Sequence, residues 1–336
     1  MQAPLISILI PAFNAERWIA GTLQSALDQT WSRKEIVVVD DGSTDRTASV
    51  VGACGAPAVR LIRQPRRGGS AAQNEALRHA TGDFIHFLDA DDLLSPETLE
   101  RQVNQIADRP GWVACGEWAR FRTSPAEAAF ERRNDWTERD PVEWLLRECT
   151  GGAPMLQPGR WLIPRAVAEG AGLWDERLTL NNDFEYIVRV LLACEGVRFT
   201  PGARLYYRSG NPYSLASLRS DAAWRSAWLS LDLGTRWMLE RADTARARRA
   251  CADLFQTLAY DAYLEHPEIA AAAEQRAAAL GGSPVPMGGG ALFALLRTTL
   301  GWKQAKRIKK LAYDLGYSRV ARAKEAALGR ERWHTA

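Results

Sequence analysis

The chain has 336 residues, of which 46% are hydrophobic and 25% charged, a balance typical of a globular protein with a substantial core. Its net charge of +3 is too small to indicate a long-range field for nucleic acid, so we expect no nucleic-acid partner. Widely spaced cysteines without a Cys-x-x-Cys pair favour reduced thiols, and no stretch approaches the ~18 apolar residues of a spanning helix. These features predict a cytoplasmic protein.

The first part of the chain alternates between short β-branched runs and segments with helical periodicity. Capping residues precede the helical segments. This alternation predicts an α/β fold, in which a mostly parallel sheet is flanked by helices on both faces. The expected strands cover residues 5–10, 35–39, 59–63, 84–89 and 112–115.

Three carboxylates follow the fourth expected strand: Asp89, Asp91 and Asp92. Such crowding is costly unless a cation neutralises it. Mg²⁺ or Mn²⁺ takes one or two carboxylates and fills its other positions with phosphate and water. The alternative is an acidic junction that faces solvent.

Four polar or turn-rich segments are expected at one edge of the sheet. They are Pro11-Ala12-Phe13-Asn14, Asp40-Asp41, Gly68-Gly69 and Asp89-Ala90-Asp91. Ligands of parallel α/β sheets bind outside the carboxyl ends of the strands, where all four segments fall. Their convergence predicts a binding site at this edge.

Patterns are weaker between residues 117 and 208. Residues 117–140 are charged and without periodicity, which predicts a loop over the site. Residues 161–163, 197–200 and 204–207 are expected to form short strands. Asp183 opens a helical pattern, so we expect it at a helix N-terminus, where the dipole keeps its carboxylate charged.

Beyond about residue 216 the pattern is helical, which predicts one domain over residues 1–215 and a helical region over residues 216–336. A Gly/Pro-rich linker covers residues 281–290. One helical stripe is typical of a packing face and is also a candidate homodimer surface. The stripe consists of Trp224, Trp228, Leu231 and Met238.

A basic tail follows the linker, with cations and no acid among them. They are Lys303, Lys306, Arg307, Lys309 and Lys310. Such a tail either lies peripherally on an anionic membrane surface, docks onto a partner, or forms a solvated helix face.

Residues 5–208 resemble the family 2 glycosyltransferases, which have the GT-A nucleotide-sugar-binding fold. The resemblance rests on the motifs Ser7-Ile8-Leu9-Ile10-Pro11-Ala12-Phe13-Asn14, Val39-Asp40-Asp41-Gly42-Ser43-Thr44-Asp45, Gly68-x-Ser70-x-Ala72-Gln73-Asn74 and Phe87-Leu88-Asp89-Ala90-Asp91-Asp92. Their order and spacing are specific.

The resemblance implies roles for these positions. Asp41 would accept a hydrogen bond from a ring N–H of the base, Asp89 and Asp91 would hold Mn²⁺ or Mg²⁺, and Asp183 would be the catalytic base. The donor would contact Pro11, Ala12, Phe13, Asn14, Asp41, Gly68, Asn74, Asp89 and Ala90. Chemistry favours the same groups, because the leaving diphosphate needs a cation and the acceptor hydroxyl needs a base. Glu185 is a second candidate base, and an ordinary helix cap is the alternative role of Asp183.

Three positions depart from the family pattern. Gln73 stands where an arginine is usual, and Asn182 where a glutamate precedes the base. The histidine expected soon after Arg208 is missing, since Ser209-Gly210-Asn211 stands there. Because that histidine often helps to hold the metal, we expect the metal to rest mainly on Asp91 and phosphate.

The expected function is therefore inverting, metal-dependent transfer of a sugar, from a UDP-linked donor, to a hydroxyl of a saccharide, lipid-linked or protein acceptor. Cell-envelope polysaccharide, glycolipid and glycoprotein synthesis all fit, and the basic tail favours the inner membrane surface. A nucleotidylyltransferase-like enzyme and a non-catalytic nucleotide-sugar-binding module are the alternatives. Pro11-Ala12-Phe13-Asn14 is not the glycine-rich phosphate loop that the former requires.

Overall fold

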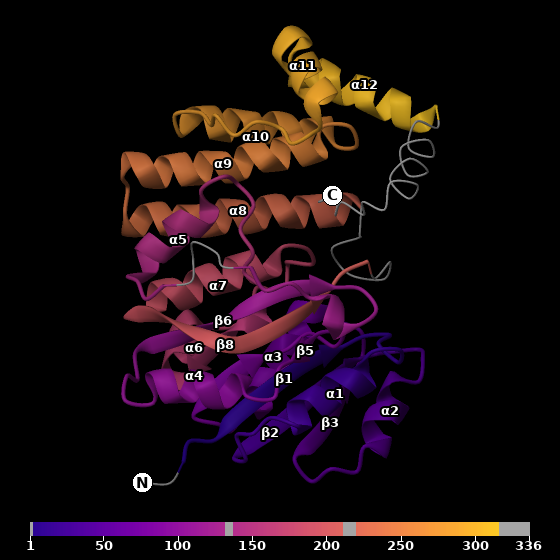
Figure 1. The fold of residues 1–336 in the computed structure, drawn as a ribbon, viewed down its shortest axis with the longest axis vertical. Helices are drawn as coiled ribbons and strands as arrows, with labels where there is room; N and C mark the ends of the chain where they lie inside the picture. The colour runs from indigo at the N-terminus through magenta and orange to yellow at the C-terminus, as the bar shows by residue number, and fades with distance from the viewer. Residues whose placement is uncertain (1–2, 132–136, 211–219, 316–336) are drawn as a thin grey trace.

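The computed structural model describes residues 3–131, 137–210 and 220–315. Its centre is a mixed sheet with the strand order β3-β2-β1-β4-β7-β6-β8-β5 (Figure 1). The strands are β1 Ile6–Ala12, β2 Lys34–Asp41, β3 Val59–Gln64, β4 Phe84–Phe87, β5 Leu93–Leu94, β6 Trp112–Phe121, β7 Trp161–Pro164 and β8 Gly196–Arg208. The predicted α/β fold is confirmed.

Strands β1 to β4 form the parallel half of the sheet, since β1 pairs in parallel with both β2 and β4, and β2 with β3. The other half is mixed: β7 is antiparallel to β4 and β6, whereas β6 and β8 are parallel. Side chains of β1 alternate between two hydrophobic clusters, with Ile8 and Ile10 on one face and Leu9 on the other. Both faces are buried, which explains the continuous apolar runs.

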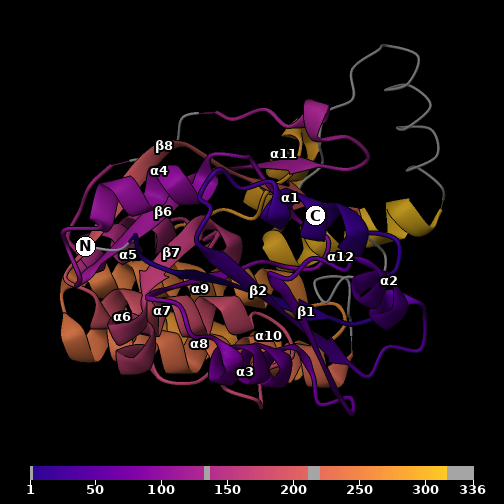
Figure 2. The same ribbon diagram turned by 90° about the horizontal axis from the view of Figure 1, so that it is seen from below.

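Helices cover both faces of the sheet (Figures 1 and 2). Buried side chains of α1, α2 and α4 pack on one face, and those of α3, α5, α6 and α7 on the other. These helices are α1 Ile19–Leu27, α2 Thr47–Ala53, α3 Gly69–His79, α4 Thr98–Ile106, α5 Pro141–Cys149, α6 Arg165–Ala171 and α7 Asn182–Ala193, with short 3₁₀ helices at Pro125–Glu127 and Pro158–Arg160.

Two expectations for residues 117–208 had the wrong strand bounds. Strand β6 continues through the expected loop 117–140 as far as Phe121, because it pairs with β8 along its length. The two short strands expected at 197–200 and 204–207 form the single strand β8. Gly116 and Glu117 of β6 pair with Thr200 and Arg204 of β8. This shift in register accommodates residues 201–203, which lie between the two expected strands.

The C-terminal helices stack above α7 in the order α8, α9 and α10, with α11 and α12 farthest from the sheet (Figure 1). They are α8 Asp221–Arg241, α9 Ala245–Ala262, α10 Pro267–Ala279, α11 Ala291–Leu300 and α12 Trp302–Asp314. The boundary expected between residues 215 and 216 lies outside the described residues, as does the chain beyond residue 315. Within the described ranges, no helix combines the length and the apolar character that a bilayer crossing requires.

The contacts of these helices show that the tryptophan stripe is a packing face, one of its two expected roles. The tryptophan stripe is no free dimer surface, because Trp224, Leu231 and Met238 are buried within the chain and the ring of Trp228 packs on Phe255. Two cations of α12 form ion pairs with acids outside the basic run. Lys303 pairs with Glu274 at 2.7 Å, and Lys310 pairs with Asp314 at 2.7 Å.

Candidate active site

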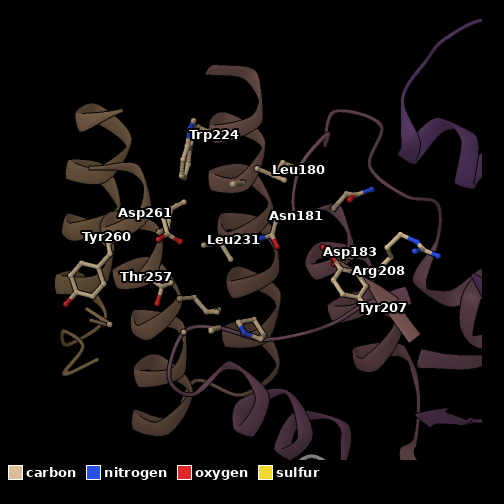
Figure 3. Close-up of a pocket in the computed structure, with 18 of the residues that line it drawn as sticks. Leu180, Asn181, Asp183, Tyr207, Arg208, Trp224, Leu231, Thr257, Tyr260 and Asp261 are labelled. Atoms are coloured by element: carbon tan, nitrogen blue, oxygen red, sulfur yellow. The ribbon is translucent and has the colours of Figure 1, made fainter. Parts of the chain in front are cut away.

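A cavity of about 2060 Å³ opens at the carboxyl ends of the central strands. Phe13 and Asp41 line it from the ends of β1 and β2, and Asp91 lines it from the segment after β4. Asp183 of α7 lines the same cavity (Figure 3). Groups far apart in the sequence thus meet in one place, because parallel strands end at a common edge.

The wall at the end of β1 is aromatic and basic. The ring of Phe13 is partly exposed, and the Arg66 guanidinium carbon lies 3.2 Å from its centroid. Asn14 has the left-handed φ of 47°, and its backbone N–H donates to Ser43 Oγ at 2.9 Å. Pro11 and Ala12 complete this wall. The segment therefore offers a flat, cation-supported surface on which a base can stack.

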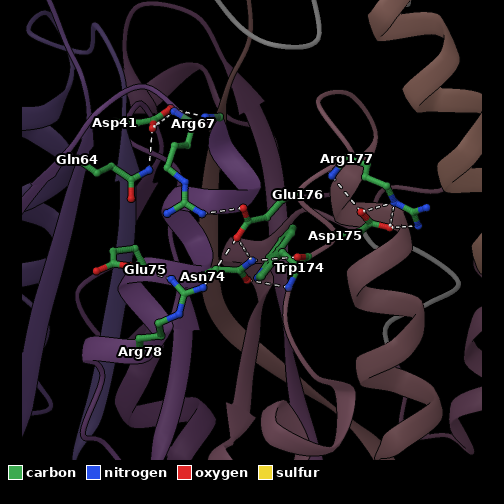
Figure 4. A network of polar contacts seen from close by, with 11 residues as sticks. Asp41, Gln64, Arg67, Asn74, Glu75, Arg78, Trp174, Asp175, Glu176 and Arg177 are labelled. Atoms are coloured by element: carbon green, nitrogen blue, oxygen red, sulfur yellow. Dashed lines mark hydrogen bonds and ion pairs between the residues drawn. The ribbon is translucent and has the colours of Figure 1, made fainter.

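Asp41 is buried at the end of β2 and holds the loop that leads to α3 (Figure 4). Its Oδ1 accepts from Gln64 Nε2 and from the Arg67 backbone N–H, both at 2.7 Å. Its Oδ2 accepts from the Gly68 backbone N–H at 2.8 Å. A carboxylate has about four acceptor positions, so these bonds leave about one for a ligand.

The first turns of α3 clamp the segment that leads to α7. Asn74 Nδ2 donates to Trp174 O and to Glu176 Oε1, both at 3.0 Å, and its Oδ1 accepts from the Trp174 backbone N–H at 2.8 Å (Figure 4). Ser70 Oγ donates to Leu178 O and accepts from Asn182 Nδ2. Neither Gly68 nor Asn74 is among the residues that line the cavity; Gln73 of the same turn is.

Asp89, Asp91 and Asp92 crowd at the end of β4. Burial and the charges of Asp91 and Asp183 raise the pKa of Asp89 to about 7. Burial and the neighbouring carboxylates also raise the pKa of Asp92, although Asp92 Oδ1 accepts from the Arg208 backbone N–H at 2.8 Å. The ionised forms of these carboxyls are therefore destabilised, and a bound cation would remove this destabilisation.

The residues at this point fit a divalent cation held by few protein ligands. Asp89 and Asp91 offer the hard carboxylate oxygens that Mg²⁺ and Mn²⁺ prefer, and both line the cavity together with Ala90. Across the described ranges, no group of three or more His, Cys, Asp or Glu side chains is arranged around one metal position. A metal here would rest on Asp89, Asp91, phosphate and water.

Asp183 lies in the first turn of α7, as expected, and its Oδ1 accepts from the Phe184 backbone N–H at 2.9 Å. Burial nevertheless raises its pKa to about 6, because desolvation outweighs the bonds of the helix terminus. Burial thus outweighs the helix dipole in setting this pKa, although a carboxyl with a pKa of about 6 is still mostly charged at pH 7, as expected. A pKa near 6 suits a general base.

Helix α8 supports the turn that precedes Asp183. Ser226 Oγ accepts from the backbone N–H groups of Thr179 and Leu180, at 2.8 and 2.9 Å. Ser230 Oγ donates to Asn181 O at 2.5 Å, which holds Asn181 at the left-handed φ of 59°. The helical region thus positions the carboxylate through side chains that no local sequence pattern identifies.

The second candidate base, Glu185, is excluded by its contacts. It is buried, pairs with Arg189 at 2.8 Å and is not among the cavity-lining residues.

Two tryptophans of the same part of the chain differ in their access to the cavity. Trp161 is buried against Trp144 in the core. Trp174 stacks on Tyr186 with ring centroids 4.1 Å apart, and it does line the cavity.

Sequence reasoning missed two arginines of the site. Arg66 lies beside Phe13, and Arg208 lies against the rings of Trp18 and Phe121, 4.3 Å from each centroid. Arg208 Nε donates to Asp91 O at 2.8 Å. The sequence signal for Arg208 is its position directly after Tyr206 and Tyr207, in the segment where the family histidine is missing.

A family model described as "Glycosyl transferase family 2" matches residues 7–171. This segment belongs to glycosyltransferase family 2. It includes Asp41, Asp89 and Asp91, and it ends before Asp183.

Curated relatives of the family 2 segment are matched over part of their length. An "Uncharacterized glycosyltransferase" of Haemophilus influenzae is 38% identical over 107 residues, which cover 31% of this chain and 43% of the relative. The Escherichia coli "UDP-Glc:alpha-D-GlcNAc-diphosphoundecaprenol beta-1,3-glucosyltransferase WfgD" is 37% identical over 107 residues, covering 32% of this chain and 42% of the relative. Chondroitin synthase of E. coli is 42% identical over 107 residues, covering 31% of this chain and 16% of the relative.

Solved structures extend the likeness beyond the family 2 segment. S. aureus TarS 1-349 in complex with UDP-GlcNAc superposes with a TM-score of 0.64 and 18% identity, covering 93% of this chain and 92% of that one. The complex with UDP gives a TM-score of 0.61. The GT-A fold, together with helices after it, is therefore shared.

Proposed function

We propose that the chain transfers a sugar from a UDP-linked donor to an acceptor hydroxyl, with a divalent metal and with inversion. The observation that carries this proposal is the single cavity lined by Asp41, Asp91 and Asp183. A base site, a diphosphate site and a general base are the three elements that the reaction requires.

The donor is proposed from the wall of the cavity and from the relatives. Phe13 with Arg66 suits stacking of a base, and the remaining acceptor position of Asp41 suits a ring N–H. The name of one matched relative includes UDP-Glc, and one matched structure is a complex with UDP-GlcNAc. Gly68 and Asn74 we assign to positioning: Gly68 N–H orients Asp41, and Asn74 holds the Trp174 segment.

Asp89 and Asp91 would hold Mn²⁺ or Mg²⁺, which supplies charge neutralisation to the leaving diphosphate. The chain adds cations of its own to the cavity: Arg208 Nε donates to Asp91 O beside this position, and Arg66 lines the cavity next to Phe13. They partly replace the charge that the family arginine at Gln73 and the missing histidine would have provided.

Asp183 accepts the proton of the acceptor hydroxyl. We assign Asp89 and Asp91 to the metal and Asp183 to the base, and a single base supports one displacement and therefore inversion at the anomeric carbon. Glu185 is unsuited to either role, because Arg189 occupies both of its oxygens.

The acceptor belongs to cell-envelope polysaccharide, glycolipid or glycoprotein synthesis, and a cytoplasmic position with peripheral contact at the membrane fits such substrates. The comparisons give no support to a nucleotidylyltransferase-like enzyme. The two domains are proposed to act together, because α8 supports the turn before Asp183.

A panel of sugar nucleotides with Mn²⁺, scored for UDP release, tests the proposal. Release from at least one donor, lost in Asp91→Ala and Asp183→Asn, is the expected result. No release from any donor, together with UDP binding that is indifferent to chelation of the metal, would identify a non-catalytic module instead.

A further inference from the structure

The cavity continues well beyond the site just described. From Asp183 it extends past Leu180 and Leu231 to Thr257 and Tyr260 of α9 (Figure 3). Sites for drug-sized ligands occupy about 300–1,000 Å³, whereas this cavity measures about 2060 Å³. A nucleotide sugar therefore leaves a large part of it for another ligand.

We define the acceptor arm as the part of the cavity between α8, α9, the segment 285–290 and the helices α11 and α12. Its walls are formed mainly by apolar side chains. They are Trp224, Ala227, Leu231, Leu254, Leu258, Val285, Met287, Phe293 and Leu296. Such walls favour hydrocarbon over a free oligosaccharide, which would leave its hydroxyl groups without partners.

The mouth of the acceptor arm is apolar as well. Leu292, Ile308 and Tyr313 line the cavity although 67%, 39% and 55% of their surfaces are exposed. Large apolar side chains that remain exposed beside a cavity indicate a surface used in binding. A hydrocarbon chain that leaves the arm would cover them.

The same mouth carries positive charge. Lys309 lines the cavity, its Nζ lies 5.3 Å from the centroid of Phe293, and no carboxylate pairs with it in the described part of the chain. Lys306 lines the cavity too, and its Nζ donates to the carbonyl oxygens of Tyr260 and Asp261. Asp261 also lines the cavity beside Lys306, so Lys309 is the cation that the mouth offers to an anionic group next to hydrocarbon.

We infer that the acceptor arm binds the hydrocarbon portion of an anionic amphiphilic acceptor, a sugar carried on a lipid through a phosphate linkage. The inference rests on the proposed function, because the hydroxyl that is glycosylated must lie at Asp183 while the lipid occupies the arm. The arm and the donor site are different parts of one cavity, so both ligands bind together.

Binding to a membrane surface would depend on different residues. Leu300 of α11 is 52% exposed, like Leu292, but it does not line the cavity. Leu300→Asp is therefore the matched control for Leu292→Asp. Both substitutions alter exposed side chains on one helix, so neither should disturb folding.

Calorimetric titration of the full chain with n-alkyl phosphates of four to twelve carbons, with and without UDP and Mn²⁺, tests the inference. Affinity should rise about twofold to fourfold for each buried methylene. UDP should leave the affinity for each alkyl phosphate unchanged or raise it. Leu292→Asp should weaken the binding of dodecyl phosphate about tenfold, whereas Leu300→Asp should leave it unchanged.

The outcomes separate the two proposals. If UDP does not bind, the proposed function fails regardless of the alkyl series. If UDP binds but chain length has no effect, or if dodecyl phosphate displaces UDP, the acceptor arm is refuted. An equal loss in Leu300→Asp, accompanied by loss of binding to anionic vesicles, would assign the exposed leucines to membrane contact and overturn the inference.

Discussion

Replacement of Asp183 by asparagine separates the catalytic role of this carboxylate from a structural one. The pKa of Asp183 is about 6, against an ordinary value of 3.8, because the side chain is desolvated. At about 1.36 kcal/mol for each pKa unit, holding the charge costs the folded state up to about 3 kcal/mol. Asparagine keeps the shape and the bond from the Phe184 backbone N–H, and it carries no charge.

The variant should therefore lose activity and gain stability. Removal of a general base lowers the transfer rate by about 10²–10⁴. Because the folded-state pKa is raised, wild-type stability is lost as pH rises from about 4 through about 6. The gain of Asp183→Asn should be up to about 3 kcal/mol above pH 6 and vanish near pH 4. Urea denaturation at a series of pH values measures it.

Glu185→Gln is the matched control two residues along the same helix. It breaks a buried ion pair with Arg189 and should cost about 3 kcal/mol, while the rate of the folded protein stays within a few-fold. The rate of the wild type should rise with pH through about 6 and then level off. The reasoning is refuted if Asp183→Asn keeps more than a tenth of the rate, or is destabilised as Glu185→Gln is.

Three further results are expected from the same structure. Because the pKa of Asp89 is raised to about 7, its contribution to folded-state stability is lost as pH rises through 7. Mn²⁺ with UDP should therefore raise the melting temperature more at pH 8 than at pH 5, and equal shifts would argue against a metal at this carboxylate. Asn74→Ala should cost about 2–4 kcal/mol in urea denaturation, because it removes buried bonds to the Trp174 segment, whereas Glu75→Ala should cost under about 1 kcal/mol; similar losses would show that the clamp is unimportant. Phe13→Ala should weaken UDP binding by about tenfold in calorimetry, the loss of one stacked base, and unchanged affinity would exclude this wall as the base site.

Local patterns predicted the parallel half of the sheet and the shared edge of its motifs. The β-branched runs before Asn14 and Asp41 were sufficient, because a buried parallel strand reads as an uninterrupted apolar segment. The antiparallel insertion of β7 was not predictable, since its partners lie far away in the sequence. Pairing of that kind is decided by tertiary packing.

The sequence predicted the residue types of the site more successfully than the environment of each residue. Asp183 was expected at a helix N-terminus and lies there, but its raised pKa follows from burial that only the folded chain creates. Ser226 and Ser230 were not predicted, because a serine on a helix has no local signal for a bond to a distant turn. The acceptor arm was missed for the same reason, as its walls come from separate helices.

A crystal structure with UDP and Mn²⁺ tests the central claim most directly. The account predicts the base on Phe13 with a ring N–H toward Asp41, and the metal between the diphosphate and Asp91. The space beside Asp183 should remain open toward the acceptor arm. A nucleotide bound away from this edge of the sheet, or a metal that contacts neither Asp89 nor Asp91, would contradict it.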